Sequence, residues 1–296
     1  MATLVSTPVT TGRAARSRDR SARPSPFSTG ILLLGAAYCL LPVLWVLIAA
    51  TKSSGDLFST FTFFPSGDLW ANITELSQFR GGLFWRWMAN TALYAGVGAL
   101  LSTYISALSG HVLAKFQFRG KNVVFAILLM GVLVPGVILA VPQYFLLAKA
   151  GLAGTYWSVL LPQILSPYGI YLARIYAAAA VPVEVVESAK TEGAGELTIF
   201  HRIALPMMLP GLVTIFLFQF VAVWNNFMLP YIMLGQEELF PVTVGLSALL
   251  NQGASQPALY SLVITGSLLS VLPLMALFLF LQRFWRVDIA AGAVKA

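Results

Sequence analysis

Six long apolar stretches constrain this chain more than any other feature of its sequence. They cover residues 29–50, 88–110, 122–147, 155–178, 207–234 and 259–282. A helix needs roughly 20 apolar residues to cross a bilayer core, and each stretch reaches that length. None contains Asp, Glu or Lys, and Arg174 is the single charged residue among them. The pattern predicts an all-α membrane protein with six transmembrane helices.

The low content of charge supports the same class. Charged residues make up 10% of the 296 residues, whereas soluble domains carry about 25%. The main alternative for the first stretch is the apolar part of a cleaved signal peptide, which is about 7–15 residues long. Residues 30–50 are longer than that without a charge. We therefore expect an uncleaved first span.

The distribution of basic residues predicts the topology. With the N-terminus in the cytoplasm, fourteen of the 18 Lys and Arg residues fall on the inside, and the four outside are Lys52, Arg80, Arg86 and Lys149. The positive-inside rule then places both termini in the cytoplasm. Residues 1–28 form a basic tail for which we expect disorder, and residues 283–296 a second cytoplasmic tail. Nucleic-acid binding by the first tail is the alternative to a topology signal.

Small residues and prolines mark particular spans. The second span carries small residues that let helices approach closely in lipid: Gly96, Gly98, Ser102, Ser106 and Gly110. The third and fourth spans carry Pro135, Pro142, Pro162 and Pro167. Each proline removes a helical hydrogen bond, so these spans are either broken along a substrate path or simply kinked.

Two outer segments have a distinct composition. Residues 53–86 are rich in aromatics, which is typical of a lipid-interface belt or of a docking surface. Residues 242–250 are apolar but too short to span. We expect a re-entrant segment or a cap there.

One long cytoplasmic loop, residues 181–210, holds four of the 11 acidic residues. Pro182 suits the first turn of a helix, and Gly193 suits a left-handed end. Val185, Val186, Ala189 and Gly193 form an apolar stripe, and Glu187 is spaced to pair with Lys190. A second short helix over 195–203 would end before Pro206. The loop is predicted to be an ordered docking element.

This loop resembles the EAA loop of binding-protein-dependent permeases of ATP-binding-cassette transporters. The matching residues are Glu187-Ser188-Ala189, Glu192-Gly193-Ala194, Phe200, Ile203, Leu205-Pro206 and Pro210. Ser188 stands where Ala is commonest, and Glu192 where Asp is commonest.

Other segments resemble the carbohydrate-uptake branch of that family. Thr155-Tyr156-Trp157, Leu161-Pro162 and Ser166-Pro167-Tyr168-Gly169 look like its fourth span. Trp224-Asn225-Asn226-Phe227 resembles its WNDF signature, with Asn226 in place of Asp. The end of the chain, residues 291–295, resembles the GAVKG tail of the second, six-span maltose-type permease.

The resemblance implies a role and partners. The chain would be a permease subunit of an ATP-driven sugar importer in the bacterial cell membrane, with a second permease, two ATP-binding subunits and an extracytoplasmic sugar-binding protein. ATP and Mg would bind to the ATPase and no cofactor to this chain. The implied ATPase-coupling residues are Glu187, Ser188, Ala189, Glu192, Gly193, Ala194, Phe200, Leu205 and Pro206. Gly292 and Lys295 would be an ATPase-contacting tail.

Residues that could contact a sugar are harder to separate from helix packing. Amides, hydroxyls and aromatics on the path suggest Asn225, Asn226, Trp224, Gln219, Tyr168 and Gln143. The alternative is that these amides make interhelical hydrogen bonds.

Catalysis is not expected from this chain. It lacks the G-x-x-x-x-G-K-[ST] loop that cradles phosphates, and its two histidines, His111 and His201, fall in predicted cytoplasmic loops. The single Cys39 allows neither an internal disulfide nor a cysteine metal cluster. An ion-coupled carrier or an intramembrane enzyme would need acids or histidines at bilayer depth, and the six stretches have none.

Overall fold

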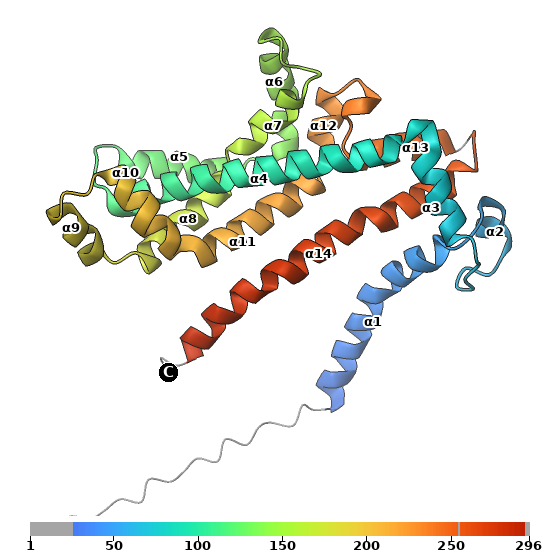
Figure 1. Ribbon diagram of the computed structural model, residues 1–296, viewed down its shortest axis with the longest axis horizontal. Coiled ribbons are helices and arrows are strands. Elements are labelled where there is room, and N and C mark those ends of the chain that lie inside the picture. The colour runs from blue at the N-terminus through green and yellow to red at the C-terminus, as the bar shows by residue number, and fades with distance from the viewer. Residues whose placement is uncertain (1–25, 254, 294–296) are drawn as a thin grey trace, which may run out of the picture. The chain divides into compact units, whose positions relative to one another are not determined.

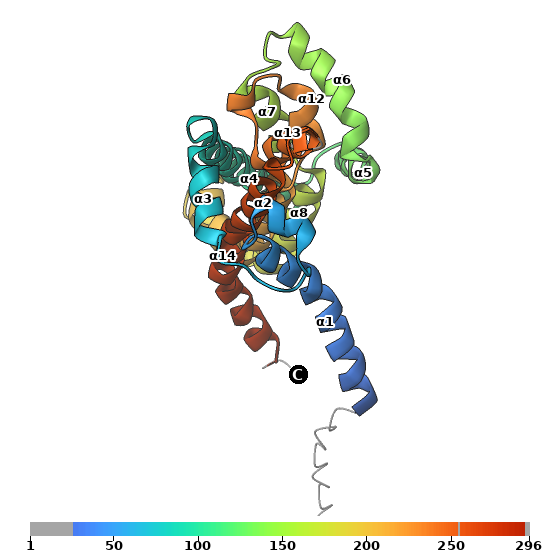
Figure 2. The same cartoon turned by 90° about the vertical axis from the view of Figure 1, so that its right-hand side faces the viewer.

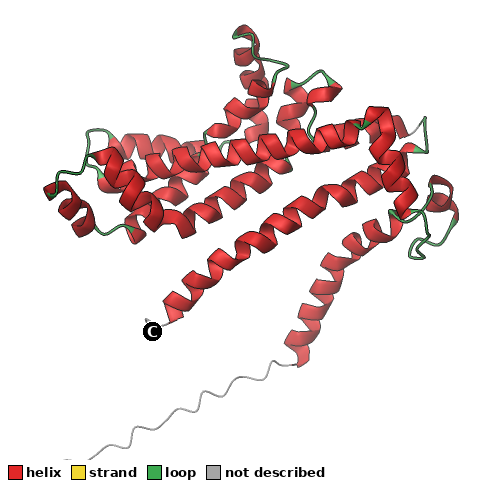
Figure 3. Cartoon of the chain, in the orientation of Figure 1, coloured by secondary structure: helices red, strands yellow, loops and turns green. Residues whose placement is uncertain are grey.

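The computed structural model describes residues 26–253 and 255–293, with side chains as far as residue 284. Within these residues every regular element is helical (Figure 3). The chain divides into two compact units, residues 1–44 and residues 45–296. The described part of the first unit is the beginning of helix α1, Pro26–Ala49. Most of the tail predicted to be disordered, residues 1–25, lies outside the described residues.

The remaining elements belong to the second unit. The outer segment and first long helix are α2 (Ser54–Ser59), α3 (Leu69–Gln78), η1 (Phe79–Gly81) and α4 (Leu83–Lys115). Next come α5 (Lys121–Leu133), α6 (Gly136–Lys149), α7 (Tyr156–Ile164), α8 (Pro167–Ala180), α9 (Val183–Thr191), α10 (Glu196–Ile199) and η2 (Phe200–Ala204). The chain continues through α11 (Leu205–Trp224), α12 (Met228–Met233), η3 (Glu237–Leu239), α13 (Val242–Gly253) and α14 (Leu259–Ala293).

Among the described residues, four helices are long and apolar enough to cross a membrane. They are Pro26–Ala49, Leu83–Lys115, Glu196–Trp224 and Leu259–Phe284. Two bent pairs would raise the number to six: α5 with α6, bent by 105° (Figure 2), and the α7–α8 stretch with α9, bent by 76°. The all-helical class and the several spans are therefore those expected from the sequence.

Helix α4 is the central helix of the second unit, because it contributes residues to each of the three apolar clusters. One end of α4 contributes Phe84 and Trp87 to a cluster with α13 and α14. Its middle contributes Tyr94 to a cluster with α6, α7, α11 and α12. Its last third contributes Ala107 to a cluster with α8, α9 and α11. Helices α8 and α11 accordingly lie along α4 (Figure 1).

Small residues of α4 allow α8 to approach very closely. A Cβ atom on Gly110 would lie 2.6 Å from the backbone of Ala173 and Arg174, and one on Gly169 would lie 2.6 Å from Ser106 Oγ. Gly98 is also buried against α7. Gly96 differs, since no atom lies within 4 Å of its added Cβ. Of the small residues in this span, Gly96 is thus not part of the contact.

Two of the four prolines coincide with helix breaks. Pro135 separates α5 from α6, and Pro167 is the first residue of α8 after a break at Leu165 and Ser166. The Ser166 hydroxyl caps α8 by accepting from the backbone N–H of Gly169 at 3.1 Å. Pro142 and Pro162 lie inside α6 and α7. A Cβ on Gly131 would lie 3.3 Å from Pro167, so the two broken stretches touch near their breaks.

At the other end of the unit, side chains of α4 satisfy the backbone of an irregular segment. Trp87 Nε1 donates to Glu237 O at 2.8 Å, and Asn90 Nδ2 donates to Glu238 O and Phe240 O. Tyr94 donates to Leu239 O, and Thr91 Oγ1 accepts from the Val242 N–H. This pairing anchors the segment before α13, the helix into which residues 242–250 fold. A buried backbone without such partners would be destabilised.

Helix boundaries differ from the expected spans at two places. The fifth apolar stretch, 207–234, is one long helix only to Trp224, and the chain then breaks at Asn225–Phe227 before α12. At the break, Asn226 Oδ1 accepts from the Leu229 N–H in the first turn of α12 at 3.3 Å. The sixth helix extends beyond residue 282 to Ala293, into the expected tail.

The Gly110 contact gives a test of the packing. We expect Gly110→Ala to destabilise the protein by about 1–3 kcal/mol, because its Cβ meets backbone that cannot move aside. Gly96→Ala is the matched control on the same helix, with open space around the new methyl. The melting temperature of the detergent-solubilised protein should fall for the first variant and stay or rise for the second. Equal melting temperatures would contradict the close approach.

Candidate functional site

The polar loop between α8 and α11 begins with helix α9. Pro182 is its N-cap, and Glu184 lies in its first turn, where a carboxylate interacts favourably with the helix dipole. Val186 and Ala189 are buried in the cluster that α4, α8 and α11 share. Val185 and Gly193, expected on the same stripe, are exposed instead. Helix α9 thus packs on the bundle through two buried apolar side chains, those of Val186 and Ala189.

Gly193 ends α9 in the way that the sequence indicated. Its φ is +84°, in the left-handed region that costs a glycine little. Gly193 N–H donates to Lys190 O at 3.0 Å, and Ala194 N–H donates to Ala189 O at 3.0 Å. These two bonds form a Schellman motif, which satisfies the last carbonyls of the helix. The turn redirects the chain into α10.

An ion pair closes the turn, but not the one expected. Lys190 Nζ lies 2.7 Å from Glu196 Oε1 at the start of α10, so the predicted Glu187–Lys190 pair is wrong. The Schellman turn brings α10 back beside the last turn of α9, and this gives Lys190 a partner across the turn. Its ammonium also lies 5.4 Å from the centre of the Phe116 ring. Glu187 is left exposed.

The expected stop before Pro206 is also wrong. Helical backbone runs continuously from Glu196 to Trp224 through a π-helical turn at Phe200–Ala204. In this turn the Leu205 N–H donates to Phe200 O, five residues back. The wider turn lies directly before Pro206, whose ring would clash with the fourth carbonyl back in a regular helix. The polar loop therefore joins the long apolar helix Glu196–Trp224 without a flexible link.

Phe200 anchors the π turn to α4. Its side chain is only 2% exposed, and its ring centre lies 6.2 Å from that of Tyr104 and 5.6 Å from that of His111. His111 is a buried residue inside α4 and not a loop residue, which corrects the expectation for this histidine. The aromatic residue of the sequence motif is therefore a packing anchor.

His201, on the same turn, makes a polar bridge to α4. Its Nδ1 lies 2.8 Å from Leu197 O, which only accepts, so Nδ1 carries a proton. Its Nε2 lies 2.9 Å from the Tyr104 hydroxyl, and in the neutral ring Nε2 accepts from that hydroxyl. The bridge and the Phe200 contacts fix the orientation of the loop relative to α4.

The outer face of α9 remains open. Glu187, Ser188 and Glu192 are exposed, and a shallow hollow beside them is lined by Glu184, Val185, Ser188, Ala189, Glu192 and Ile203. A lining that combines carboxylates with apolar side chains suits a basic or hydrogen-bond-donating segment of another protein. Of the expected coupling residues, Ala194 is half-buried at the turn, while Phe200 and Leu205 belong to or pack against the core.

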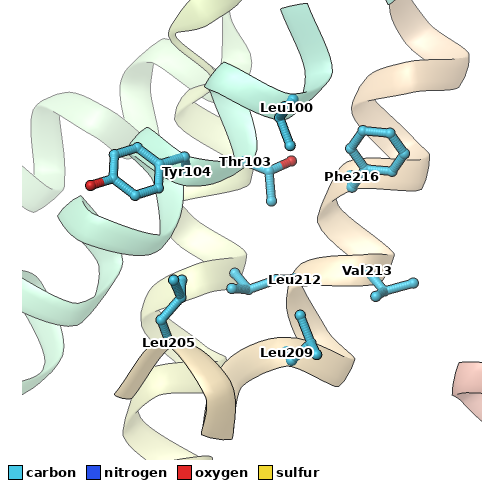
Figure 4. A pocket seen from close by; sticks show the side chains of 8 residues that line it. All are labelled: Leu100, Thr103, Tyr104, Leu205, Leu209, Leu212, Val213 and Phe216. Atoms are coloured by element: carbon cyan, nitrogen blue, oxygen red, sulfur yellow. The ribbon is translucent and has the colours of Figure 1, made fainter. Parts of the chain in front are cut away.

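An apolar groove runs beside the π turn between α4 and α11. Figure 4 shows its lining residues, Leu100, Thr103, Tyr104, Leu205, Leu209, Leu212, Val213 and Phe216. Tyr104, which bonds to His201, forms one wall of the groove, and Leu205 of the sequence motif forms another. The loop motif and the spanning helices thus share side chains at this point.

The candidate sugar-contacting residues have different surroundings. Trp224 is 3% exposed and stacks on Phe220 in the core. Asn225 donates to Val221 O within its own helix, and Gln219 donates to Gln163 O across to α7. Tyr168 is exposed on α8 and its ring lies near that of Phe218. Gln219 therefore makes an interhelical hydrogen bond, the packing alternative.

The expected tail contacts lie at the edge of what the structure describes. Gly292 falls within the backbone of α14, where side chains are outside the described residues. Lys295 lies outside the described residues altogether.

Residues 99–287 match the family described as "Binding-protein-dependent transport system inner membrane component". The match covers more than half of the chain, so the protein belongs to this family. It is accordingly a permease component, not an enzyme, and a multi-pass protein of the bacterial cell membrane.

Relatives of similar length support the assignment. The chain is 31% identical over 280 residues to the arabinooligosaccharides transport system permease protein AraQ of Halalkalibacterium halodurans, which covers 92% of this chain and 99% of that protein. It is 26% identical to the diacetylchitobiose uptake system permease protein NgcG of Streptomyces coelicolor, covering 96% of this chain and 92% of that protein. It is 29% identical to the lactose transport system permease protein LacG of Rhizobium radiobacter, with 92% and 97% covered.

A solved structure shows the same fold. A bacterial ABC transporter involved in the import of the acidic polysaccharide alginate matches with a TM-score of 0.76 at 20% identity, covering 87% of this chain and 94% of that chain.

The Schellman turn can be tested with a pair of glycines in the loop. No atom lies within 4 Å of an added Cβ at either Gly193 or Gly195, but φ is +84° at Gly193 and −73° at Gly195. Gly193→Val should therefore loosen the turn by at least about 1–2 kcal/mol, and Gly195→Val should not. Hydrogen exchange of the amides in 189–199 is the measurement. Gly193→Asn should fall between wild type and Gly193→Val, because Asn tolerates the left-handed region.

Proposed function

We propose that this chain is one permease subunit of an ATP-driven sugar importer and that it contacts the ATPase through residues 182–206. The observation that carries the proposal is the exposed acidic face of α9, mounted without a flexible link on a membrane-crossing helix. The α5–α6 pair is one span and the α7–α8 stretch is another, with α9 outside the membrane, which gives six spans with both termini in the cytoplasm. The chain then provides half of the translocation path.

The rigid attachment suits the transmission of force. Helix α9 is held by a buried apolar line, by the Lys190–Glu196 ion pair and by the Phe200 anchor. A displacement of α9 by the ATPase therefore moves the π turn and α11 with it. Such a rigid-body movement of packed elements is one way to switch a permease between inward-open and outward-open states. Glu187, Ser188, Glu192 and the turn at Gly193–Ala194 form the contact surface in this proposal.

The substrate class follows from the relatives. Three of them are named as transport proteins for arabinooligosaccharides, diacetylchitobiose and lactose, which are all short carbohydrates. A related solved complex contains a periplasmic protein with bound alginate pentasaccharide. We propose a short oligosaccharide as the cargo, an extracytoplasmic binding protein that delivers it, a second permease subunit, and two ATPase subunits that bind ATP and Mg.

The coupling proposal predicts the effect of removing one carboxylate. Glu187→Ala should lower sugar uptake and the amount of ATPase that co-purifies by about ten-fold or more, because a hydrogen bond to a charged group contributes about 1.5–3 kcal/mol. Glu75→Ala is the matched control, since Glu75 is also an exposed helical carboxylate, on α3. Uptake by the whole transporter in proteoliposomes and ATPase recovery are measured together.

Unchanged uptake and unchanged ATPase recovery for Glu187→Ala would contradict the contact. A loss for Glu75→Ala of the same size would show that the effect is not specific to α9. Uptake that follows an ion gradient and persists without ATP would favour an ion-coupled carrier instead.

The cargo is tested with a panel of sugars. Proteoliposomes with the full transporter and its binding protein are supplied with radiolabelled arabinotriose, diacetylchitobiose, lactose and glucose. We expect ATP-dependent accumulation of at least one oligosaccharide and none of glucose. Accumulation of amino acids or of inorganic ions, used as a parallel panel, in place of every sugar would overturn the substrate class.

A further inference from the structure

Arg174 is the one charged residue in the six apolar stretches, and the proposed coupling does not use it. In the described part of the chain its guanidinium makes no hydrogen bond and no ion pair. Charged side chains within membrane spans are costly, and they usually face a bundle interior or a water-filled cavity and mark a substrate or ion pathway. The position of Arg174 therefore calls for a partner that the described residues do not supply.

Aromatic rings hold the guanidinium in place. Its central carbon lies 3.7 Å from the centre of the Phe125 ring on α5. The Phe125 ring in turn lies nearly parallel to that of Tyr171, with centres 6.3 Å apart and an angle of 23°. Stacking uses the face of the guanidinium and leaves its N–H groups, which lie in the plane, free to donate. The cluster thus combines two aromatic rings with the N–H donors of one guanidinium.

The backbone below the cluster is fixed. Gly110 of α4 packs so closely on Ala173 and Arg174 that a Cβ there would lie 2.6 Å from their backbone atoms. The Arg174 side chain therefore leaves α8 on the side away from α4, toward Phe125. The fixed backbone and the ring contact order the long Arg174 side chain before any ligand binds. Binding then costs less conformational entropy.

The cluster lines a hollow along the last turns of α8 and the first turns of α5. The hollow has a volume of about 620 Å³ and is lined by Phe125, Tyr171, Arg174, Ile175, Ala178 and Ala179. Pro167 begins α8 on one side of Arg174, and Ala180 ends it about 9 Å away on the other, at 1.5 Å per residue. Gly131 of α5 touches Pro167. Broken helices line the substrate path in many transporters.

We propose that Phe125, Tyr171 and Arg174 form a contact site for the oligosaccharide on its way to the cytoplasm, an inference that rests on the proposed function. A sugar ring has an apolar face of C–H groups, which packs on the aromatic pair, and hydroxyl oxygens at its edge, which accept from Arg174. The guanidinium fork matches two neighbouring hydroxyls, as it matches other paired oxygens. The site is thus distinct from Asn225, Asn226 and Trp224, the candidates from the sequence.

Two substitutions of Arg174 separate the effect of its paired N–H donors from the effect of its charge. In proteoliposomes that contain the whole transporter, Arg174→Gln should lower the uptake of arabinotriose about ten-fold or more, since a hydrogen bond from a charged donor is lost. Arg174→Lys keeps the charge but not the planar fork, and it should recover only part of the rate. Arg119→Gln, an exposed arginine in the link before α5, is the matched control.

Two further measurements distinguish a sugar contact from a structural role. The melting temperature and the recovery of the second permease should be unchanged in both Arg174 variants. A photoreactive benzoylphenylalanine at position 125 should cross-link radiolabelled arabinotriose, and excess unlabelled sugar should compete. If the panel identifies another oligosaccharide as the cargo, that sugar replaces arabinotriose in every arm.

The outcomes are separable. Loss of the second permease from the Arg174→Gln complex would show that Arg174 pairs with an acid on that subunit, which overturns the proposal. Cross-linking to phospholipid but not to sugar would assign the hollow to lipid and overturn it too. Normal sugar uptake by all variants would refute the site while leaving the importer intact. Absence of any ATP-driven sugar uptake by the wild type would refute the proposed function itself.

Discussion

The close approach of α4 and α8 at Gly110 is the contact on which the rest of the second unit depends. Side chains of ordinary size would keep two helices 8–10 Å apart, whereas here no Cβ fits between them. Within lipid there is little hydrophobic drive between helices, so such van der Waals contact provides much of the association. The contact positions α8, and with it the start of the loop that carries α9.

The same region of α4 also contacts the end of the loop, where the π turn leads into α11. Tyr104, Ala107 and His111 lie on successive turns of α4 and contact either Phe200 or His201 or their cluster. The loop is therefore held at both ends by one helix: through α8 before α9, and through the π turn after it. An exposed acidic surface with so little freedom is costly to order unless it binds a partner, and this cost is the physical reason for interpreting it as a docking surface.

Much of this could be predicted from the sequence, because periodicity and glycine chemistry are local. The apolar runs indicated the spanning helices, and Gly193 indicated the left-handed end of α9. Long-range outcomes were not predictable in the same way. Lys190 pairs with Glu196 and not with Glu187, because the turn brings Glu196 close to it. His111 is buried because Phe200 packs against it. Pro206 did not end a helix because a π turn preceded it.

The helix breaks show a similar division between local and long-range causes. Pro135 and Pro167 break their helices, but Pro142 and Pro162 do not, although the residue type is the same. At Pro167 the preceding Ser166 caps the new helix, so the freed backbone groups have a partner. A break that is capped in this way is a stable structural feature and not a weak point. The unpaired guanidinium of Arg174 lies on the helix that this break begins, and an apolar span tolerates such a group best where water or a polar solute reaches it. The charge and the break at Pro167 thus lie on the same helix, about 10 Å apart along its axis.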